Sequence, residues 1–500
     1  MKILFLLPLL FLSFFSYAQD MRAATWVFAS NNKLVFTSNS VQHIPFNISQ
    51  GIGFDYQDHI LNSMSYSTIS DTESGLVLFT NSVDLRTQED YPISGFYQLD
   101  NIGANCLLLP KPNFSKQYYM FRTGSFSNCI GIPPLSLNLP PSMLFHLVNM
   151  GEFNEFGEKG KLLEERIIRK QDPVSAKLAA TSHHNKVDYW ILVHEWNNNT
   201  FIAYLLTEKG LIDSVKTSIG GVFKDFDYTF CISTNVPNRN NFGQMKISPA
   251  GDMVALTMFA EKAIEVFSFN NSTGQLGCFR RYDLNSAMGT DEYLYGIEIS
   301  PNGRFVYVSS QKKIMQPNES SLYQIDLLEP NAPKAIQVIA RGQSGYTGLQ
   351  LAIDGKIYVA RFYQKHLGVI HQPNLPYPAC NFEEEGLYLN GNRVGIALNN
   401  VVSSFLPKSS PILELPNAFT PNGDGINDSF VPIRMEGVFV KDIRIYNSWG
   451  KEVYKANNFE QAWEDKDVPA GMYHYAITYH TGYLCEQNTQ IYKGWVQVLK

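Results

Sequence analysis

A repeat with a period of 52 residues constrains the fold of this chain more than any other feature. Three segments align without gaps, and each reads as a strand, a tight turn of the S-P-x-G kind or a close variant, and a second strand. Their turn glycines are Gly251, Gly303 and Gly355, each 52 residues from the next. Proline suits the second turn position and glycine the left-handed one, so each unit is predicted to contain a β-hairpin. The aligned segments are 245–256, 297–308 and 349–360.

Each unit continues into a further predicted strand, at residues 263–269, 322–327 and 367–371. Repeats of about 50 residues with three or four strands each are typical of propeller blades. Weaker copies lie upstream, within residues 68–80, 107–121 and 179–193. We expect residues 397–405 to give the inner strand of a final blade, whose outer strand comes from residues 26–29. This arrangement predicts seven blades, although the irregular upstream copies leave six or eight open.

Composition agrees with an all-β chain and excludes one class of partner. Aromatic residues make up 13% of the sequence, with Tyr and Phe dominating, and such residues favour strands. The formal net charge of −6 argues against nucleic acid, whose binding needs a basic surface.

The N-terminus has the pattern of a secretory signal peptide. Lys2 precedes an almost unbroken apolar run over residues 3–15, and Ser16 and Ala18 stand at the −3 and −1 positions. We therefore predict a signal peptide over residues 1–18 with cleavage before Gln19, the alternative being an uncleaved anchor. No later segment is apolar enough for a transmembrane helix, so the mature chain is expected to be exported without one.

The chain contains six cysteines, which are widely spaced and include no C-x-x-C pair. A zinc ribbon is therefore excluded. An oxidising compartment permits disulfides, but six cysteines allow 15 pairings and buried thiols are an equally good account. The cysteines are Cys106, Cys129, Cys231, Cys278, Cys380 and Cys485.

The sequence after the propeller region predicts a second, smaller domain. Residues 19–406 form the predicted propeller, and the Pro/Ser-rich stretch 407–411 is a linker without periodicity. Residues 412–500 then hold predicted strands at 443–446, 473–477 and 495–499, which suggest a small Ig-like β-sandwich. Trp449, Tyr473 and Trp495 are expected to fill its core.

A turn-rich segment at residues 419–428 opens this second domain, and its order of motifs is specific. It reads F-T-P-N-G-D-G-I-N-D and is followed by Trp449-Gly450, by V-P-A-G-M-Y over residues 468–473, and by a terminal strand. This order resembles the gliding motility-associated C-terminal domain, the type B sorting domain of the bacterial type IX secretion system. The residues that carry the resemblance are Phe419, Thr420, Pro421, Asn422, Gly423, Asp424, Gly425, Asn427, Asp428, Trp449, Gly450, Gly471 and Tyr473.

The resemblance implies a destination and a partner. A protein with such a domain would be delivered by the type IX secretion machinery to the cell surface or the medium. The repeat region in turn resembles the lactonase-like (YVTN-type) β-propellers, and the whole chain is similar to secreted Bacteroidota proteins that join the two domains.

We find no complete catalytic motif. Tyr346 replaces the second glycine of G-x-S-x-G, and Asn198 replaces the second histidine of H-E-x-x-H. His183-His184 near Asp188, and the pair at 194–195, could gather at one face of the propeller as a metal or acid/base site. Solvated histidines in a turn beside a buried strand are the interpretation that we favour.

Ca²⁺ is the one cofactor that the sequence suggests, through Asn422, Asp424 and Asp428. The register does not fit an EF-hand loop, because Thr420 and Val431 would occupy its first and last positions. A turn held by Asx hydrogen bonds is the favoured alternative, and no cofactor is then needed.

Three functions remain open for the propeller. The first is a binding module for a protein or glycan ligand, carried outward by the C-terminal domain. The second is a lactonase-like or glycan-active hydrolase with its site in the funnel. The third is a structural protein of adhesion or gliding motility.

Overall fold

The computed structural model is almost entirely β-strand over the residues that it describes. These are residues 20–29, 32–45, 65–71, 75–81, 84–94, 105–123, 143–169, 174–223, 240, 242–259, 261–289, 292–312, 320–329, 331–342, 345–460, 463–464, 467–484 and 487–499. The predicted signal peptide lies outside them. The helical elements among them are the short 3-10 turns η1 (Met21–Ala23) and η2 (Ser403–Phe405) and the four-residue helix α2 (Ala332–Ala335).

Seven antiparallel sheets follow one another along the described part of residues 25–388, each built from consecutive strands. The first two sheets have three strands each and the other five have four. Their strands, sheet by sheet, are β1 (Thr25–Phe28), β2 (Asn32–Phe36) and β3 (Val41–Pro45); β4 (Ser67–Ser70), β5 (Leu76–Thr80) and β6 (Leu85–Thr87); β7 (Asn105–Pro110), β8 (Gln117–Thr123), β9 (Met143–Phe153) and β10 (Lys159–Arg169); β11 (Val174–Ser182), β12 (Tyr189–Glu195), β13 (Thr200–Thr207) and β14 (Gly210–Ser218); β15 (Met245–Ile247), β16 (Met253–Met258), β17 (Ala263–Asn270) and β18 (Gln275–Asp283); β19 (Tyr293–Ile299), β20 (Phe305–Gln311), β21 (Ser320–Asp326) and β22 (Ile336–Gly342); and β23 (Tyr346–Leu351), β24 (Ile357–Arg361), β25 (His366–Ile370) and β26 (Phe382–Tyr388).

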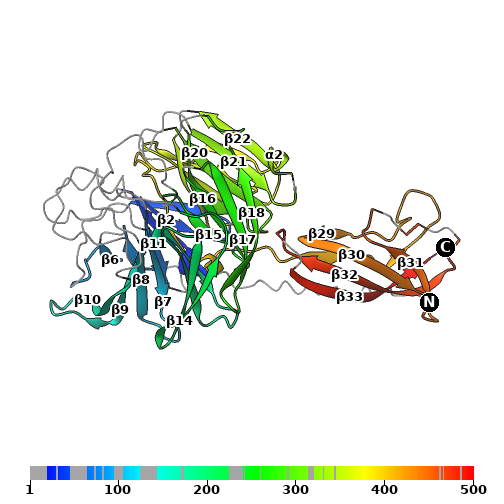
Figure 1. Ribbon diagram of the computed structural model, residues 1–500, viewed down its shortest axis with the longest axis horizontal. Coiled ribbons are helices and arrows are strands. Elements are labelled where there is room, and N and C mark those ends of the chain that lie inside the picture. Colours follow the sequence, from blue (N-terminus) through cyan, green and yellow to red (C-terminus); the bar gives the residue numbers. More distant parts are fainter. Residues whose placement is uncertain are drawn as a thin grey trace, which may run out of the picture.

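The first strand of each sheet packs against the first strand of the next, from β1 through β4, β7, β11, β15 and β19 to β23. The seventh sheet meets the first through Trp26 of β1, whose ring centroid lies 5.7 Å from that of Tyr358 on β24. The sheets therefore close into a seven-bladed propeller, the rounded body at the left of Figure 1. The predicted all-β fold and the blade number are confirmed.

The predicted closing blade is wrong in its composition. Residues 26–29 belong to the first sheet, which β1, β2 and β3 complete without a strand from the chain's later part. Residues 394–402 instead make single bridges, from Val394 to Phe362 and from Asn399 to Tyr66. The Asn400 side chain donates to the carbonyls of Cys106 and Leu178, on β7 and β11. This segment therefore lies across the inner edges of several blades, where its side-chain amide bonds to β7 and β11.

The repeat turns lie on one face of the propeller. Gly251, Gly303 and Gly355 have φ values of 74°, 75° and 79°, the left-handed conformation predicted for them. Each closes a hairpin between the first and second strands of its blade, at residues 248–252, 300–304 and 352–356. We call this side the turn face. Because the strands are antiparallel, the second strand of each blade ends on the opposite face.

The C-terminal domain extends away from the propeller in Figure 1. Its main sheet has the order β28-β33-β32-β30-β31, and β27 pairs with β29 in a smaller sheet. The core lies on one side of the main sheet and includes Phe419, Phe430 and Trp463. The strands are β27 (Ile412–Glu414), β28 (Ala418–Phe419), β29 (Arg434–Glu436), β30 (Val438–Tyr446), β31 (Glu452–Ala456), β32 (Gly471–Thr481) and β33 (Gln487–Val498).

Candidate functional site

The motif residues of the C-terminal domain come together at the end of the sheet that lies farthest from the propeller. Strand register places them there, because Phe419 lies beside Val498 and Gly471 also pairs with Val498. Residues 447–451 close the β30–β31 hairpin at the same end, since Tyr446 pairs with His474. Figure 1 shows this end projecting into solvent, with the chain's C-terminus beside it. We call it the distal end.

Residues 420–428 form a compact loop at the distal end that is held by its own side chains. The two carboxylate oxygens of Asp428 accept the N–H groups of Gly423 and Gly425, at 2.6 and 2.7 Å. Asp424 accepts the N–H of Ile426 at 2.8 Å, and its own N–H donates to the side chain of Asn422 at 3.0 Å. These are the Asx bonds that we predicted for the segment.

Three aromatic residues fix this loop on the sheet. Phe419 and Tyr473 are buried, and each packs on Trp463 with ring centroids 5.1 Å apart. The Tyr473 hydroxyl donates to the carbonyl of Pro469 at 2.9 Å, which ties the turn before β32 to the strand. Tyr473 therefore is core, as predicted, and Trp463 is the core tryptophan that sequence reasoning did not assign.

The predictions for the other two tryptophans are wrong. Trp449 is 91% exposed in the β30–β31 turn, where the Asn447 side chain accepts the N–H groups of Trp449 and Lys451. Trp495 is 46% exposed because it pairs with His474, whereas its neighbour Val496 pairs with Tyr473 on the buried face. Trp495 faces solvent because successive side chains of a strand point to opposite faces of the sheet. Trp449 faces solvent because it lies in a turn that no core element covers.

Exposed apolar side chains gather at the distal end as a result. They come from the motif loop, the β30–β31 turn, the start of β32 and the end of β33. Their exposed fractions are 67% for Ile426, 91% for Trp449, 50% for Met472 and 42% for Leu499. We call these four residues the distal apolar surface. Exposed apolar residues at one end of a domain are candidates for an interaction site.

The centre of the propeller holds a buried polar cluster that sequence reasoning missed. Lys246, Glu298 and Gln350 stand five residues before the three repeat glycines, on β15, β19 and β23. The Lys246 ammonium lies 3.5 Å from a Glu298 oxygen and donates to the Gln350 side chain. Burial lowers the pKa of Lys246, and Glu298 opposes that shift. The repeat alignment could have revealed this cluster, because the same position is polar in all three of the otherwise apolar inner strands.

A second buried charge lies on β11. The Lys177 ammonium donates to the carbonyls of Asn240 and Phe242, and it lies 4.9 Å from the ring centroid of Phe223. Burial lowers its pKa to about 7, against an opposing attraction from Glu265. This lysine is surrounded by backbone carbonyls and rings, which is the environment of a structural group.

The histidines of the sequence analysis do not come together. His183 lies in the turn before β12 and His194 near the other end of that strand. His184 is exposed, as predicted, but His194 is buried and stacks on Phe223 with centroids 3.8 Å apart. Burial lowers the pKa of His194 to about 3. Over the described residues, no group of three or more His, Cys, Asp or Glu side chains is placed to hold a metal ion.

In the part of the chain that the structure describes, no helix is long and apolar enough to cross a membrane.

Comparison with solved structures gives weak likenesses. The periplasmic gluconolactonase PpgL of Pseudomonas aeruginosa has 12% identity and a TM-score of 0.38, covering 74% of this chain and 96% of that one. Hydrazine synthase of Kuenenia stuttgartiensis has 12% identity and a TM-score of 0.34, covering 70% and 96%. The Cps50 (Swd1) β-propeller domain of Myceliophteria thermophila has 10% identity and a TM-score of 0.34, covering 68% and 93%. No curated protein matches the chain.

The C-terminal domain matches a known family directly. Residues 413–498 correspond to the CHU_C type IX secretion signal domain. The match begins one residue inside the predicted domain and spans all of its motif residues. The chain therefore carries a type IX secretion signal domain at its C-terminus, and with it a link to the type IX secretion machinery and to a place at the cell surface or outside the cell.

Proposed function

We propose that this is a two-part exported protein, in which the C-terminal domain is read by the type IX secretion machinery and the propeller is the binding module that it delivers. A signal peptide over residues 1–18 would first take the chain across the inner membrane. The observation that carries the proposal is the match of residues 413–498 to the type IX secretion signal domain. Its motif residues gather at one exposed end of the domain.

The distal apolar surface is the part of the domain that we assign to recognition. Trp449 is 91% exposed and holds no core position, so the stability of the domain gives no reason for a tryptophan there. The opposite end of the domain rests against the propeller, where Leu484 is buried. A partner that binds the domain while the propeller is attached is thus expected to approach from the distal end.

The export proposal is tested by fractionation of cells that express the full chain, the chain ending at Pro407, and two full-length variants. Trp449→Ala should lower the exported fraction at least tenfold, as should the truncation. Ile491→Ala is the matched control, because Ile491 is 60% exposed on β33 and lies away from the distal end. Equal export of the full and truncated chains would refute the sorting role. Normal export of Trp449→Ala alone would refute only its assignment to the surface.

For the propeller, a group of exposed side chains on blade seven supports binding. Tyr363 and Tyr388 are 37% and 51% exposed, on the face opposite the turn face. The Arg393 guanidinium lies 5.4 Å from the Tyr363 ring centroid, and the His366 ring lies 4.9 Å from Tyr388. Tyrosines beside cations and imidazoles combine apolar faces with hydrogen-bonding edges. A sugar ring or a protein loop is bound by such a surface, so a glycan or protein ligand fits it.

This binding role is tested with the purified full chain on arrays of bacterial glycans and on cell envelopes. Tyr363→Ala combined with Tyr388→Ala should reduce binding at least tenfold. Tyr91→Ala is the control, because Tyr91 is also half exposed but follows β6 in another blade. Unchanged binding by the double variant would contradict the assignment. The hydrolase and adhesion interpretations stay predictions, which turnover assays and motility of a deletion strain would test.

A further inference from the structure

Blade seven has two segments, residues 362–365 and 389–394, that are joined by backbone hydrogen bonds on the face opposite the turn face. The N–H of Tyr363 donates to the Val394 carbonyl at 3.0 Å, and the N–H of Val394 donates to the Gln364 carbonyl at 2.9 Å. The two segments therefore form one continuous surface, which includes the exposed ring of Tyr363.

Tyr363 is held in an unusual backbone conformation. Its φ is 61°, in the left-handed region that bulky residues rarely adopt. The Phe362 ring packs edge-on against the Tyr363 ring, with centroids 4.6 Å apart, and the Arg393 guanidinium donates to the Tyr363 carbonyl at 3.4 Å. Such a conformation persists only where surrounding contacts fix it, and it is concentrated at functional sites. The exposed ring of Tyr363 therefore stands on a fixed backbone.

The same two segments carry positive charge that their own residues do not balance. They contain Lys365 and Arg393, both exposed, and no Asp or Glu. Over the described residues, neither of these cations forms an ion pair. The glutamates at 383–385, which precede the second segment on β26, are paired with His371 and Arg361 at distances from 2.9 to 3.5 Å. A chain with a net charge of −6 thus presents a local cationic surface here.

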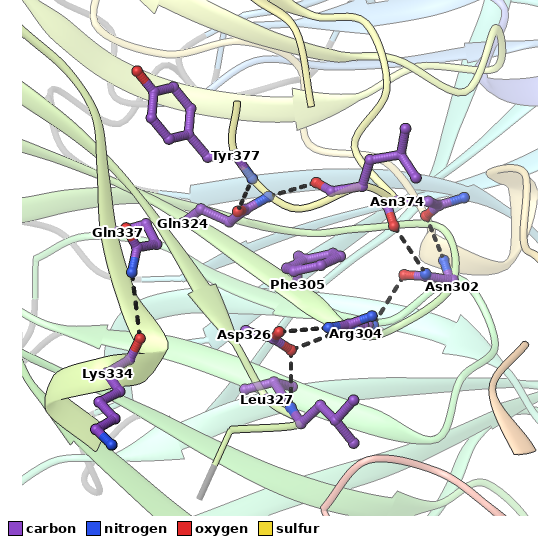
Figure 2. Close-up of polar contacts among 12 residues, drawn as sticks. Asn302, Arg304, Phe305, Gln324, Asp326, Leu327, Lys334, Gln337, Asn374 and Tyr377 are labelled. Atoms are coloured by element: carbon purple, nitrogen blue, oxygen red, sulfur yellow. Dashed lines mark hydrogen bonds and ion pairs between the residues drawn. The ribbon is translucent and has the colours of Figure 1, made fainter. Parts of the chain in front are cut away.

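Arg304 on the turn face is a contrasting case. Its guanidinium also lies over an aromatic ring, 4.8 Å from the ring centroid of Phe305. Figure 2 shows that Asp326 accepts from two of its nitrogens, at 2.9 and 2.7 Å, so that a carboxylate of the chain itself satisfies this arginine. Arg393 has the matching contact with the Tyr363 ring but no such carboxylate among the residues described. Its remaining N–H donors are therefore available to a carboxylate from outside the chain.

Blade one fixes the backbone that carries Arg393. The buried Asn32 side chain donates to the Arg393 carbonyl at 3.0 Å. The Asn390 side chain donates to Nδ1 of His43 at 2.9 Å, so Nε2 of this ring carries the hydrogen that it donates to Asn32 at 3.1 Å. Burial lowers the pKa of His43, which favours the neutral ring that these bonds require. The cation of this surface is thus held by two blades.

We propose that the surface formed by Tyr363, Lys365, Tyr388 and Arg393 binds an acidic glycan, whose sugar rings carry carboxylates. We call it the blade-seven surface. The inference rests on the binding role proposed above and names the chemical class of the ligand. The Arg393 guanidinium pairs with a ring carboxylate, and the tyrosine rings pack on the apolar faces of the sugars. An acidic peptide would match the charge, but it offers no series of ring faces to the two exposed tyrosines.

Calorimetry with the purified full chain tests the class of ligand. The probes are a hexamer of galacturonic acid and its methyl ester, which has the same rings without the charge. We expect the acid to bind about tenfold more tightly than the ester, and the difference to shrink in about 0.5 M NaCl. Equal binding of both would overturn this inference and leave the glycan-binding role intact. Binding of neither, together with no binding on the glycan arrays, would reject both proposals.

Variants test whether the named cations read the charge. Arg393→Gln should weaken binding of the acid about tenfold and Lys365→Gln about threefold, while binding of the ester stays unchanged and shows that each variant is folded. Arg341→Gln is the matched control, because Arg341 is also exposed and bound to a carbonyl, that of Ala287 at 2.6 Å, but lies on blade six. A preference for the acid that survives in the double variant would overturn the assignment.

Polyglutamate separates the glycan from a peptide ligand. It has carboxylates without sugar rings, so it should bind at least tenfold more weakly than the acid hexamer. Equally tight binding of polyglutamate that Arg393→Gln abolishes would make an acidic peptide the ligand and overturn the proposed class.

Discussion

Lys246 and Glu298 occupy the same position of successive 52-residue repeats and meet as a buried ion pair, with Nζ and Oε2 3.5 Å apart. The pair joins β15 to β19, and the bond from Lys246 to Gln350 extends the link to β23. Glu298 also accepts the N–H groups of Ile299 and Leu351 at 2.9 Å. Three blades are therefore coupled through one lysine at the centre of the ring.

Removing one member of this pair should destabilise the propeller more than altering both. Lys246→Met leaves the Glu298 carboxylate buried without its cation, which costs about 3–5 kcal/mol. The double variant Lys246→Met, Glu298→Gln removes both charges and should recover at least half of that loss. Urea unfolding of the full chain measures each difference. A single variant within about 0.5 kcal/mol of the parent would show that the pair couples nothing.

Lys177 should make stability rise with pH. Its pKa is about 7 in the folded protein and 10.5 as the ordinary value, so between these pH values the unfolded chain binds the extra proton. The free energy of unfolding then increases with pH by up to about 1.4 kcal/mol per unit. Denaturation from pH 7 to 10 should show parent and Lys177→Met curves that diverge with this sign. Lys209→Met, at an exposed position, should run parallel to the parent. If the stability of Lys177→Met changed with pH in parallel with that of the parent, the lowered pKa would not belong to Lys177.

Substitution by alanine should affect stability strongly at one tryptophan of the C-terminal domain and hardly at all at another. Trp463 is 3% exposed and touches Phe419 and Tyr473, so Trp463→Ala should cost about 3–5 kcal/mol of domain stability. Trp449 is 91% exposed, so Trp449→Ala should change stability by less than about 0.5 kcal/mol. Thermal unfolding of both full-length variants checks this, and a large loss in Trp449→Ala would mean that its export defect reports misfolding.

Asp428 should matter to the distal loop without any cation. Asp428→Ala removes two charge-assisted acceptors from the N–H groups of Gly423 and Gly425, which should cost about 1–3 kcal/mol of domain stability. Because both carboxylate oxygens already accept these bonds, Ca²⁺ should not shift the melting temperature of the parent. A rise on adding Ca²⁺ that EDTA reverses, and that Asp428→Ala abolishes, would instead establish the predicted metal site.

Much of the fold could be predicted from short sequence patterns. The repeat glycines predicted hairpins at 248–252, 300–304 and 352–356, and these formed because turn chemistry depends on a few adjacent residues. The number of seven blades came from counting the strong and weak repeat copies together with a predicted closing blade, and the sequence left six or eight open. The composition of the closing blade did not follow, because residues 394–402 satisfy carbonyls on strands that are distant in sequence. No local pattern records such partners.

The sequence by itself determined the propeller, the presence of a second domain and the secretion signal, since each is written in motifs a few residues long. Only the tertiary structure decided which side chains are exposed, which are buried and which are paired. It placed Trp449 in solvent and Trp463 in the core, although both are tryptophans of one domain. It brought Lys246 to Glu298 and Arg280 to Leu484. Burial and charge pairing depend on what the rest of the chain packs against each residue, and that is set only when the sheets close.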